Sequence, residues 1–125
     1  MANKKVLVVE DNPANMELFM DLLAVGGYES LAATTGEEAL RLALVEIPGL
    51  VLLDIQLPGM DGLTVVKELR ARTETQGIKV IALTAYAMSG DREKFLGEGF
   101  DGYLSKPVAI KEFLKVIGTY MPISS

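Results

Sequence analysis

Short apolar runs alternate with helical repeats along the whole 125-residue chain, and this alternation restricts the fold more than any other feature of the sequence. The apolar runs have the length of strands and lie at residues 5–9, 26–33, 50–53, 79–84 and 101–105. The stretches with apolar residues at helical spacing lie at residues 13–25, 36–46, 62–72, 89–96 and 110–120. Five strand–helix units in strict alternation predict a parallel sheet with right-handed crossovers and helices on both faces.

The composition of the predicted strands indicates their order in the sheet. Runs 5–9, 50–53 and 79–84 are continuously aliphatic, as strands buried on both faces should be. Runs 26–33 and 101–105 carry polar residues and are therefore expected at the two edges. The order 2-1-3-4-5 satisfies both conditions and is the flavodoxin-like arrangement. We expect one flavodoxin-like (βα)5 domain of the α/β class that covers residues 1–125.

The composition also argues against several classes of function. A formal net charge of −5 does not fit a nucleic-acid-binding surface, which needs clustered positive charge. No apolar run approaches the ~18 residues of a membrane span, and the first residues lead straight into a strand, so a cytoplasmic protein is expected. Cysteine and histidine are absent, which excludes disulfides, the usual zinc sites and Ser-His-Asp catalysis on this chain.

Chemically competent side chains fall at the carboxyl ends of four predicted strands, which is where sheets of this kind bind ligands. These side chains are Glu10, Asp11, Asp54, Thr84 and Lys106. Crowded carboxylates repel, and a pair ~4 Å apart costs about 4 kcal/mol at an effective dielectric of ~20. A hard cation relieves this repulsion, and oxygen ligands without His or Cys favour Mg²⁺ over softer metals.

Asp54 is the most informative of these residues, because it directly follows the aliphatic run LVLL (50–53) and has no obvious capping role. A carboxylate beside Mg²⁺ that faces a phosphoryl donor is a candidate nucleophile and would form an aspartyl phosphate. Lys106 would supply a point charge to the anion, and Thr84 a hydroxyl donor. Singly, Asp11 could be a helix cap, Thr84 a strand residue and Lys106 a surface charge. Their convergence on one edge favours a functional site.

Four motifs carry a resemblance to a known family: VLVVEDN (6–12), LLDIQLPGMDG (52–62), ALTAYAMSGD (82–91) and GYLSKP (102–107). With them, essentially the whole chain resembles the response-regulator receiver domains of two-component signalling. It is most similar to the DivK-type single-domain regulators. The resemblance implies a single receiver domain that is phosphorylated and has no output domain.

The resemblance also implies roles for individual residues. Asp54 would accept the phosphoryl group. Mg²⁺ would be held by Asp11, Asp54 and the backbone carbonyl of Gln56, with Glu10 acting through water. Glu10 stands where many relatives have Asp, which adds one methylene and keeps the charge.

Three further residues would contact the phosphoryl group or change conformation in response to it. By the resemblance, Thr84 and Lys106 would contact its oxygens, and Tyr103 would change rotamer together with Thr84. The Lys106–Pro107 bond is typically cis in this family. Residues 56 and 86, two after Asp54 and two after Thr84, should flank the path of hydrolytic water, where Tyr86 can shield the acyl phosphate.

The phosphoryl donor is expected to be a histidine on another protein, a sensor histidine kinase or a histidine phosphotransferase, because this chain has none. The signal would leave by contact with a downstream protein target, either through a phosphorelay or through an allosteric complex. We expect no nucleic-acid partner and no membrane insertion. Although it would catalyse its own phosphorylation and dephosphorylation, the chain would be a signalling protein rather than a turnover enzyme.

Three other functions fit the sequence less well. A haloacid-dehalogenase-like phosphatase or transferase needs a second Asp two residues after its nucleophile, and that position is Gln56. A flavodoxin or nucleotide module needs a phosphate loop, whereas EDNPAN follows the first strand and both G-x-x-x-x-G-K-[ST] and G-x-G-x-x-G are missing. A degenerate receiver that acts only as a docking module would not need all five site groups.

The first predicted helix offers a docking surface for the donor protein. Its apolar stripe is predicted to face the core through Met16, Phe19, Met20 and Leu23. Leu18 and Leu22 should then face outward or flank the stripe, with Asn15 one turn before Leu18, nearer the Asp54 end. An apolar strip here would add affinity without adding charge near the transferred group.

Overall fold

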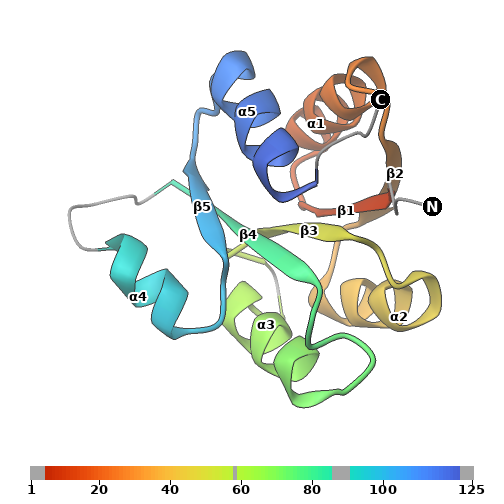
Figure 1. The fold of residues 1–125 in the computed structure, drawn as a ribbon, viewed down its shortest axis with the longest axis vertical. Helices are drawn as coiled ribbons and strands as arrows, with labels where there is room; N and C mark the ends of the chain where they lie inside the picture. Colours follow the sequence, from red (N-terminus) through yellow and green to blue (C-terminus); the bar gives the residue numbers. More distant parts are fainter. Residues whose placement is uncertain (1–4, 58, 86–90, 122–125) are drawn as a thin grey trace.

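The computed structural model describes residues 5–57, 59–85 and 91–121 and has one sheet between two layers of helices (Figure 1). The strands are β1 (Lys5–Val9), β2 (Glu29–Ala33), β3 (Leu50–Asp54), β4 (Lys79–Thr84) and β5 (Gly102–Ser105). All neighbouring pairs are parallel, and the order is β2-β1-β3-β4-β5, so the predicted order is confirmed. The third strand is one residue longer than predicted and includes Asp54, which pairs with Leu83.

The helices are α1 (Pro13–Val25), α2 (Gly36–Glu46), α3 (Gly62–Ala71), α4 (Asp91–Gly97) and α5 (Ile110–Tyr120). Figure 1 shows α1 and α5 on one face of the sheet, and α2, α3 and α4 on the other. The start of the predicted helix 89–96 lies outside the described residues, and α4 continues to Gly97. Of the helices in the described ranges, none is long and apolar enough to cross a membrane.

Side chains of the central strands alternate between two hydrophobic cores. In β1, Val6 and Val8 pack with α1 and α5, whereas Leu7 and Val9 pack on the side of α2 and α3. The same alternation occurs in β3 and β4, and nearly all of these residues are fully buried. Two-sided burial is what an uninterrupted aliphatic strand predicts, because no face is left for water.

The orientation of α1 differs from the prediction on both flanks of the helix. Leu22, predicted to face outward or to flank the stripe, is 9% exposed and lies in the core, so its assignment to an exposed docking strip is wrong. Phe19 of α1 stacks on Phe113 of α5 with ring centroids 5.4 Å apart, and α5 thereby covers the flank that carries Leu22. On the opposite flank Met16 and Met20, predicted in the core stripe, are only half-buried. Helical periodicity gives the width of an apolar stripe but not the neighbour that covers its edges.

Side-chain caps fix where α1 and α3 begin, and both caps are residue types that favour this position. Asn12 accepts a hydrogen bond from the N–H of Asn15 at 3.1 Å, at the start of α1. Asp61 accepts one from the N–H of Thr64 at 2.9 Å, at the start of α3. Both caps follow loops at the carboxyl end of the sheet, so they anchor the segments that carry Asp11 and Asp54.

The amino-terminal end of the sheet is fastened by Arg70, near the end of α3. Its guanidinium donates to the carbonyls of Gly99 at 2.9 Å, Gln76 at 2.8 Å and Ile78 at 2.6 Å. It also donates to the carboxylate of Asp101 at 2.9 Å, which in turn accepts from the N–H of Val80 at 2.8 Å. One side chain therefore ties α3 to the segments that enter β4 and β5.

The cap at α3 generates a stability prediction. Asp61→Ala should lower the free energy of unfolding by about 1 kcal/mol, because the first turn loses its acceptor, whereas Asp61→Asn should retain most of the stability. The hydrogen bond from the Thr64 N–H holds the pKa of Asp61 below its ordinary value. The charged cap therefore stabilises above the unfolded-state pKa, and this contribution is lost as the pH falls through the lowered value.

Urea denaturation at neutral and at acid pH measures both effects. The stability difference between the wild type and Asp61→Ala should shrink on acidification. A difference that stays constant, or an Asn variant as damaged as the Ala variant, would contradict the capping role.

Candidate functional site

Three carboxylates meet where β1 and β3 end side by side. Glu10 directly follows β1 and is 1% exposed, while Asp54 ends β3 and is 4% exposed. Asp11 is exposed at the rim. One oxygen from each of the three lies within 4.8 Å of the others. The pairing of β1 with β3 brings Asp54 beside Glu10 and Asp11, although more than forty positions separate it from them in the sequence.

The ammonium of Lys106 lies between the two buried carboxylates. Its Nζ is 2.8 Å from Asp54 Oδ2 and 2.8 Å from Glu10 Oε2. The contact with Asp54 is a hydrogen bond, whereas the contact with Glu10 is an ion pair without the alignment of a hydrogen bond. The backbone N–H of Lys106 donates to the carbonyl of Thr84 at 2.8 Å, and the Lys106–Pro107 bond is cis, as the resemblance implied.

Backbone amides hold the other oxygens of these carboxylates. The N–H of Gln56 donates to Asp54 Oδ1 at 2.9 Å, and the N–H of Asn12 donates to Glu10 Oε1 at 3.2 Å. In each case the donor is two residues after the carboxylate, so the loop that leaves the strand orients the side chain at its end. Both carboxylates therefore present a fixed geometry before any ligand arrives.

The close packing changes the acid–base properties of the site. Burial raises the pKa of Glu10, and the charge of Asp54 adds to this, while Lys106 acts in the opposite direction. Burial lowers the pKa of Lys106, but the contacts with Asp54 and Glu10 outweigh it and leave the pKa above its ordinary value. Lys106 is therefore a permanent cation near neutral pH, and two carboxylates compete for it.

Gly62 supports the position of Asp54, and the sequence analysis did not single it out. A Cβ at Gly62 would lie 2.8 Å from the carbonyl oxygen of Asp54 and 2.8 Å from the Cα of Ile55. Its N–H donates to the carbonyl of Ile55 at 3.0 Å, so α3 begins directly against the end of β3. The glycine in the MDG triplet was the available signal, since a close backbone approach favours a residue without a side chain.

Thr84 and Tyr103 occupy neighbouring strands. Thr84 ends β4, is 4% exposed, and pairs with Ser105 in the register of the sheet. Tyr103 is half-buried, and its ring packs against Phe95 of α4 at a centroid distance of 5.7 Å and an interplanar angle of 53°. Tyr103 therefore joins the face of the sheet that α4 covers. The predicted shielding residue, Tyr86, lies outside the described residues, and Gln56 is exposed.

The predicted docking residues do not form one surface. Leu18 is 41% exposed, whereas Leu22 is buried. Asn15 is half-buried, and its N–H is used by the cap at Asn12. Leu18 thus remains as the exposed apolar side chain of that strip.

Comparison with known proteins identifies the family. The family model for the response regulator receiver domain matches residues 6–118. The chain belongs to the response regulator receiver family. It is 46% identical over 118 residues to the polar-differentiation response regulator DivK of Brucella ovis, an alignment that covers 94% of this chain and 96% of that protein.

Solved receiver structures agree with this assignment. The receiver domain of the sensor histidine kinase PA1611 of Pseudomonas aeruginosa PAO1 has a TM-score of 0.86 and 34% identity, covering 95% of this chain and 98% of that chain. The chemotaxis response regulator CheY4 of Vibrio cholerae has a TM-score of 0.88 and 27% identity, covering 97% of this chain and 99% of that chain. The PA1611 structure contains a magnesium ion coordinated in its active-site cleft.

The acidic cluster of this receiver has the chemistry of a Mg²⁺ site. Its donors are the carboxylate oxygens of Glu10, Asp11 and Asp54. Three carboxylates face a single ammonium, so the site carries excess negative charge that a divalent cation would neutralise. Asp11 is the exposed member, and it offers oxygens that do not contact Lys106 in the described contacts.

Magnesium should therefore stabilise the fold. With Mg²⁺ at roughly 10–100 times its dissociation constant, the free energy of unfolding should rise by about 1–3 kcal/mol. Asp11→Asn should remove most of this gain without leaving a buried charge unpaired. Chemical denaturation in Mg²⁺ and in EDTA measures the difference, with Glu37→Gln on α2 as an exposed control that should behave as the wild type. A full gain in Asp11→Asn would mean that the ion binds elsewhere.

Proposed function

We propose that this receiver accepts a phosphoryl group from a phosphohistidine of a partner kinase or phosphotransferase onto Asp54, in a Mg²⁺-dependent reaction. The observation that carries the proposal is the position of the Asp54 carboxylate. It is nearly buried at the end of β3, accepts a hydrogen bond from Lys106, and lies within the acidic cluster. Its orientation by the Gln56 amide fits a nucleophile that must meet its donor in line.

The reaction balances with the groups present. A carboxylate oxygen of Asp54 forms the new bond to phosphorus, the phosphorus–nitrogen bond to the donor histidine breaks, and the imidazole keeps the released electron pair. Lys106 can follow the charge, because its ammonium contacts Asp54 Oδ2 before the reaction and can contact a phosphoryl oxygen afterwards. A bound Mg²⁺, held by Asp11, Asp54 and the Gln56 carbonyl with Glu10 nearby, would supply further neutralisation of the transferred group.

Phosphorylation would be transmitted through Thr84 and Tyr103. A phosphoryl group on Asp54 would attract the Thr84 hydroxyl, and the space vacated beside β5 would let Tyr103 turn inward from its contact with Phe95. A coupling free energy of about 1–3 kcal/mol is sufficient to shift such a two-state element 5–150-fold. The changed surface of α4 and β5 would then be read by a partner protein, which makes the chain a signalling protein and not a turnover enzyme.

The other candidate functions have less support. A phosphatase or transferase would need an acid–base side chain two residues after Asp54. That residue is Gln56, whose amide side chain is not an acid or base and whose backbone N–H donates to Asp54. A docking module without phosphorylation would leave the buried ion pairs of Lys106 with Glu10 and Asp54 without a purpose.

Phosphorylation at Asp54 can be tested directly. Acetyl phosphate with Mg²⁺ should add one phosphoryl group, and intact-mass measurement should show its loss after hydroxylamine treatment. Asp54→Ala should abolish the gain, while Glu37→Gln should leave it unchanged. A gain that persists in Asp54→Ala would overturn the assignment.

The exposed flank of α1 is proposed as the docking surface for the phosphohistidine protein. Leu18→Ala should slow phosphorylation by a cognate histidine kinase by about three- to tenfold, because an apolar contact at the interface is lost. Labelling by acetyl phosphate should stay nearly intact.

Two variants of the same helix separate docking from folding. Val25→Ala, which changes an 80% exposed residue at the far end of α1, should leave both donors unaffected. Leu22→Ala should destabilise the fold, since Leu22 is a core residue. Equal losses with both donors in a fully folded Leu18→Ala protein would rule out a docking role.

A further inference from the structure

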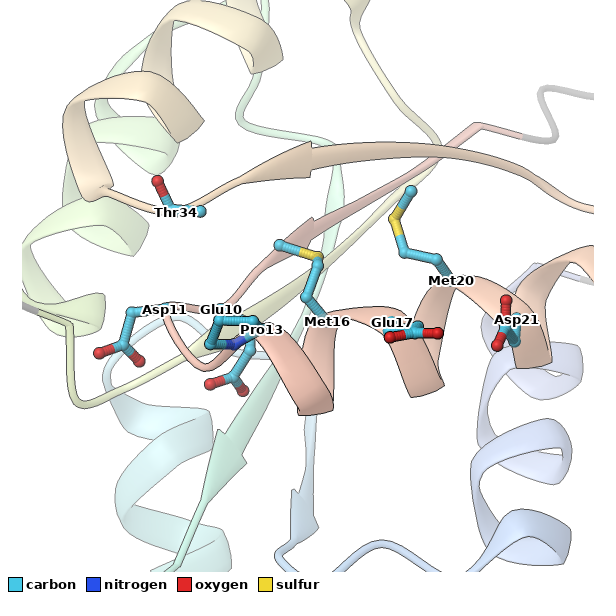
Figure 2. A pocket seen from close by; sticks show the side chains of 8 residues that line it. All are labelled: Glu10, Asp11, Pro13, Met16, Glu17, Met20, Asp21 and Thr34. Atoms are coloured by element: carbon cyan, nitrogen blue, oxygen red, sulfur yellow. The ribbon is translucent and has the colours of Figure 1, made fainter.

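A hollow of about 460 Å³ lies along α1, on the flank opposite to Leu18 (Figure 2). Met16 and Met20 project from the helix toward the β2 side, and Thr34 closes the hollow from the segment that follows β2. This volume falls within the range of about 300–1,000 Å³ found for small-molecule sites. Of the described residues assigned to the phosphorylation site and the docking surface, only Glu10 and Asp11 belong to its lining.

The hollow exists because β2 is an edge strand with small side chains on this face. In the register of the sheet, Ser30 pairs with Val6 and Ala32 with Val8, whose side chains enter the core beneath α1. Because side chains alternate along a strand, Ser30 and Ala32 face the same side as Val6 and Val8. Two small residues cannot cover the methionines of α1.

The rim of the hollow is acidic. Glu17 and Asp21 lie one turn apart on α1, and Asp11 lies at the end nearest the metal cluster. The lining in the described part of the chain contains no Lys or Arg. Among the ion pairs of the described residues, none involves these three carboxylates.

We propose that this hollow binds a small hydrophobic monocation, with its apolar body on Met16 and Met20 and its ammonium at Glu17 and Asp21. Methionine is suited to such a floor, because its unbranched, polarizable side chain adapts to ligands of irregular shape. The charge complementarity selects a cation over an anion of the same shape. This inference does not depend on the proposed function, since it involves neither Asp54 nor Lys106.

Asp11 gives the hollow a connection to the metal site. It belongs both to the lining and to the acidic cluster, so a cation at Glu17 and Asp21 lies on the same acidic rim as Mg²⁺ in the cluster, and the two like charges repel. The two should therefore bind together but weaken each other about two- to fivefold, and the effect must be reciprocal. A ligand of this class would thus lower the Mg²⁺ occupancy of the receiver.

The test uses the methyl resonances of ¹³C-labelled methionine in the whole chain. The probe is 4-phenylbutylammonium, with 4-phenylbutyrate as an anion of similar size and 4-phenylbutanol as a neutral analogue. The ammonium should shift the Met16 and Met20 signals and leave Met121, which is 6% exposed, unchanged. Binding should persist in saturating Mg²⁺ and tighten about two- to fivefold in EDTA.

Variants assign the site. The pair Glu17→Gln and Asp21→Asn should weaken the ammonium about tenfold by removing its counter-charges, and Met20→Ala should weaken it several-fold by removing apolar contact. Glu37→Gln is the matched control and should change nothing.

Several outcomes would overturn the proposal. They are equal shifts with the anion, binding that disappears in saturating Mg²⁺, and binding unaffected by the paired variant. Binding only of a peptide in which lysine is flanked by apolar residues, and not of the free amine, would assign the hollow to a protein partner instead.

Discussion

The shared ammonium of Lys106 is the interaction on which the site depends. Two nearly buried carboxylates, from Glu10 and Asp54, lie within 2.8 Å of the same Nζ. Without this cation their mutual repulsion at the end of a buried sheet would cost several kcal/mol, because charges interact strongly where water is scarce. Every other feature of the site, from the loop amides to the exposed Asp11, surrounds this pair of contacts.

The proposed phosphoryl group would enter a site with one ammonium and an excess of carboxylates, so its binding would depend on Lys106 and on a bound Mg²⁺. Lys106 is bound by contacts that a phosphoryl group can replace, since both are to carboxylate oxygens. The amides of Gln56 and Asn12 hold the carboxylates in place independently of Lys106. The Lys106 ammonium could therefore exchange one partner for another while the carboxylates of Glu10 and Asp54 keep their positions.

The sequence predicts the fold almost completely, because this fold is specified by local patterns of apolar and polar residues. Strand order follows from which runs lack polar residues, and the caps at Asn12 and Asp61 follow from residue type and position. The site residues converge for the same reason, since parallel strands end at one edge.

What could not be predicted depends on contacts between distant elements. Leu22 is buried because α5 approaches that flank of α1, and no local repeat encodes the approach. The ion pair of Glu10 with Lys106 depends on where the longer Glu side chain places its carboxylate. The hollow at Met16 and Met20 depends on the small side chains that the edge strand β2 presents beneath α1. The two flanks of α1 thus differ for reasons of packing rather than sequence pattern.

The hydrogen bonds of Arg70 influence which parts of the domain can open locally. Its guanidinium donates to three carbonyls and to the Asp101 carboxylate at the amino-terminal end of the sheet, and these partners lie on the two segments that enter β4 and β5. The carboxyl end is held by the ion pairs of Lys106 with Glu10 and Asp54, which a phosphoryl group or a metal ion could replace. Local opening should therefore be rarer at the amino-terminal end of the sheet than at the carboxyl end, and amide hydrogens near Arg70 should exchange more slowly than those near Lys106. Small displacements would then be confined to the carboxyl edge of the sheet, where the acidic cluster lies.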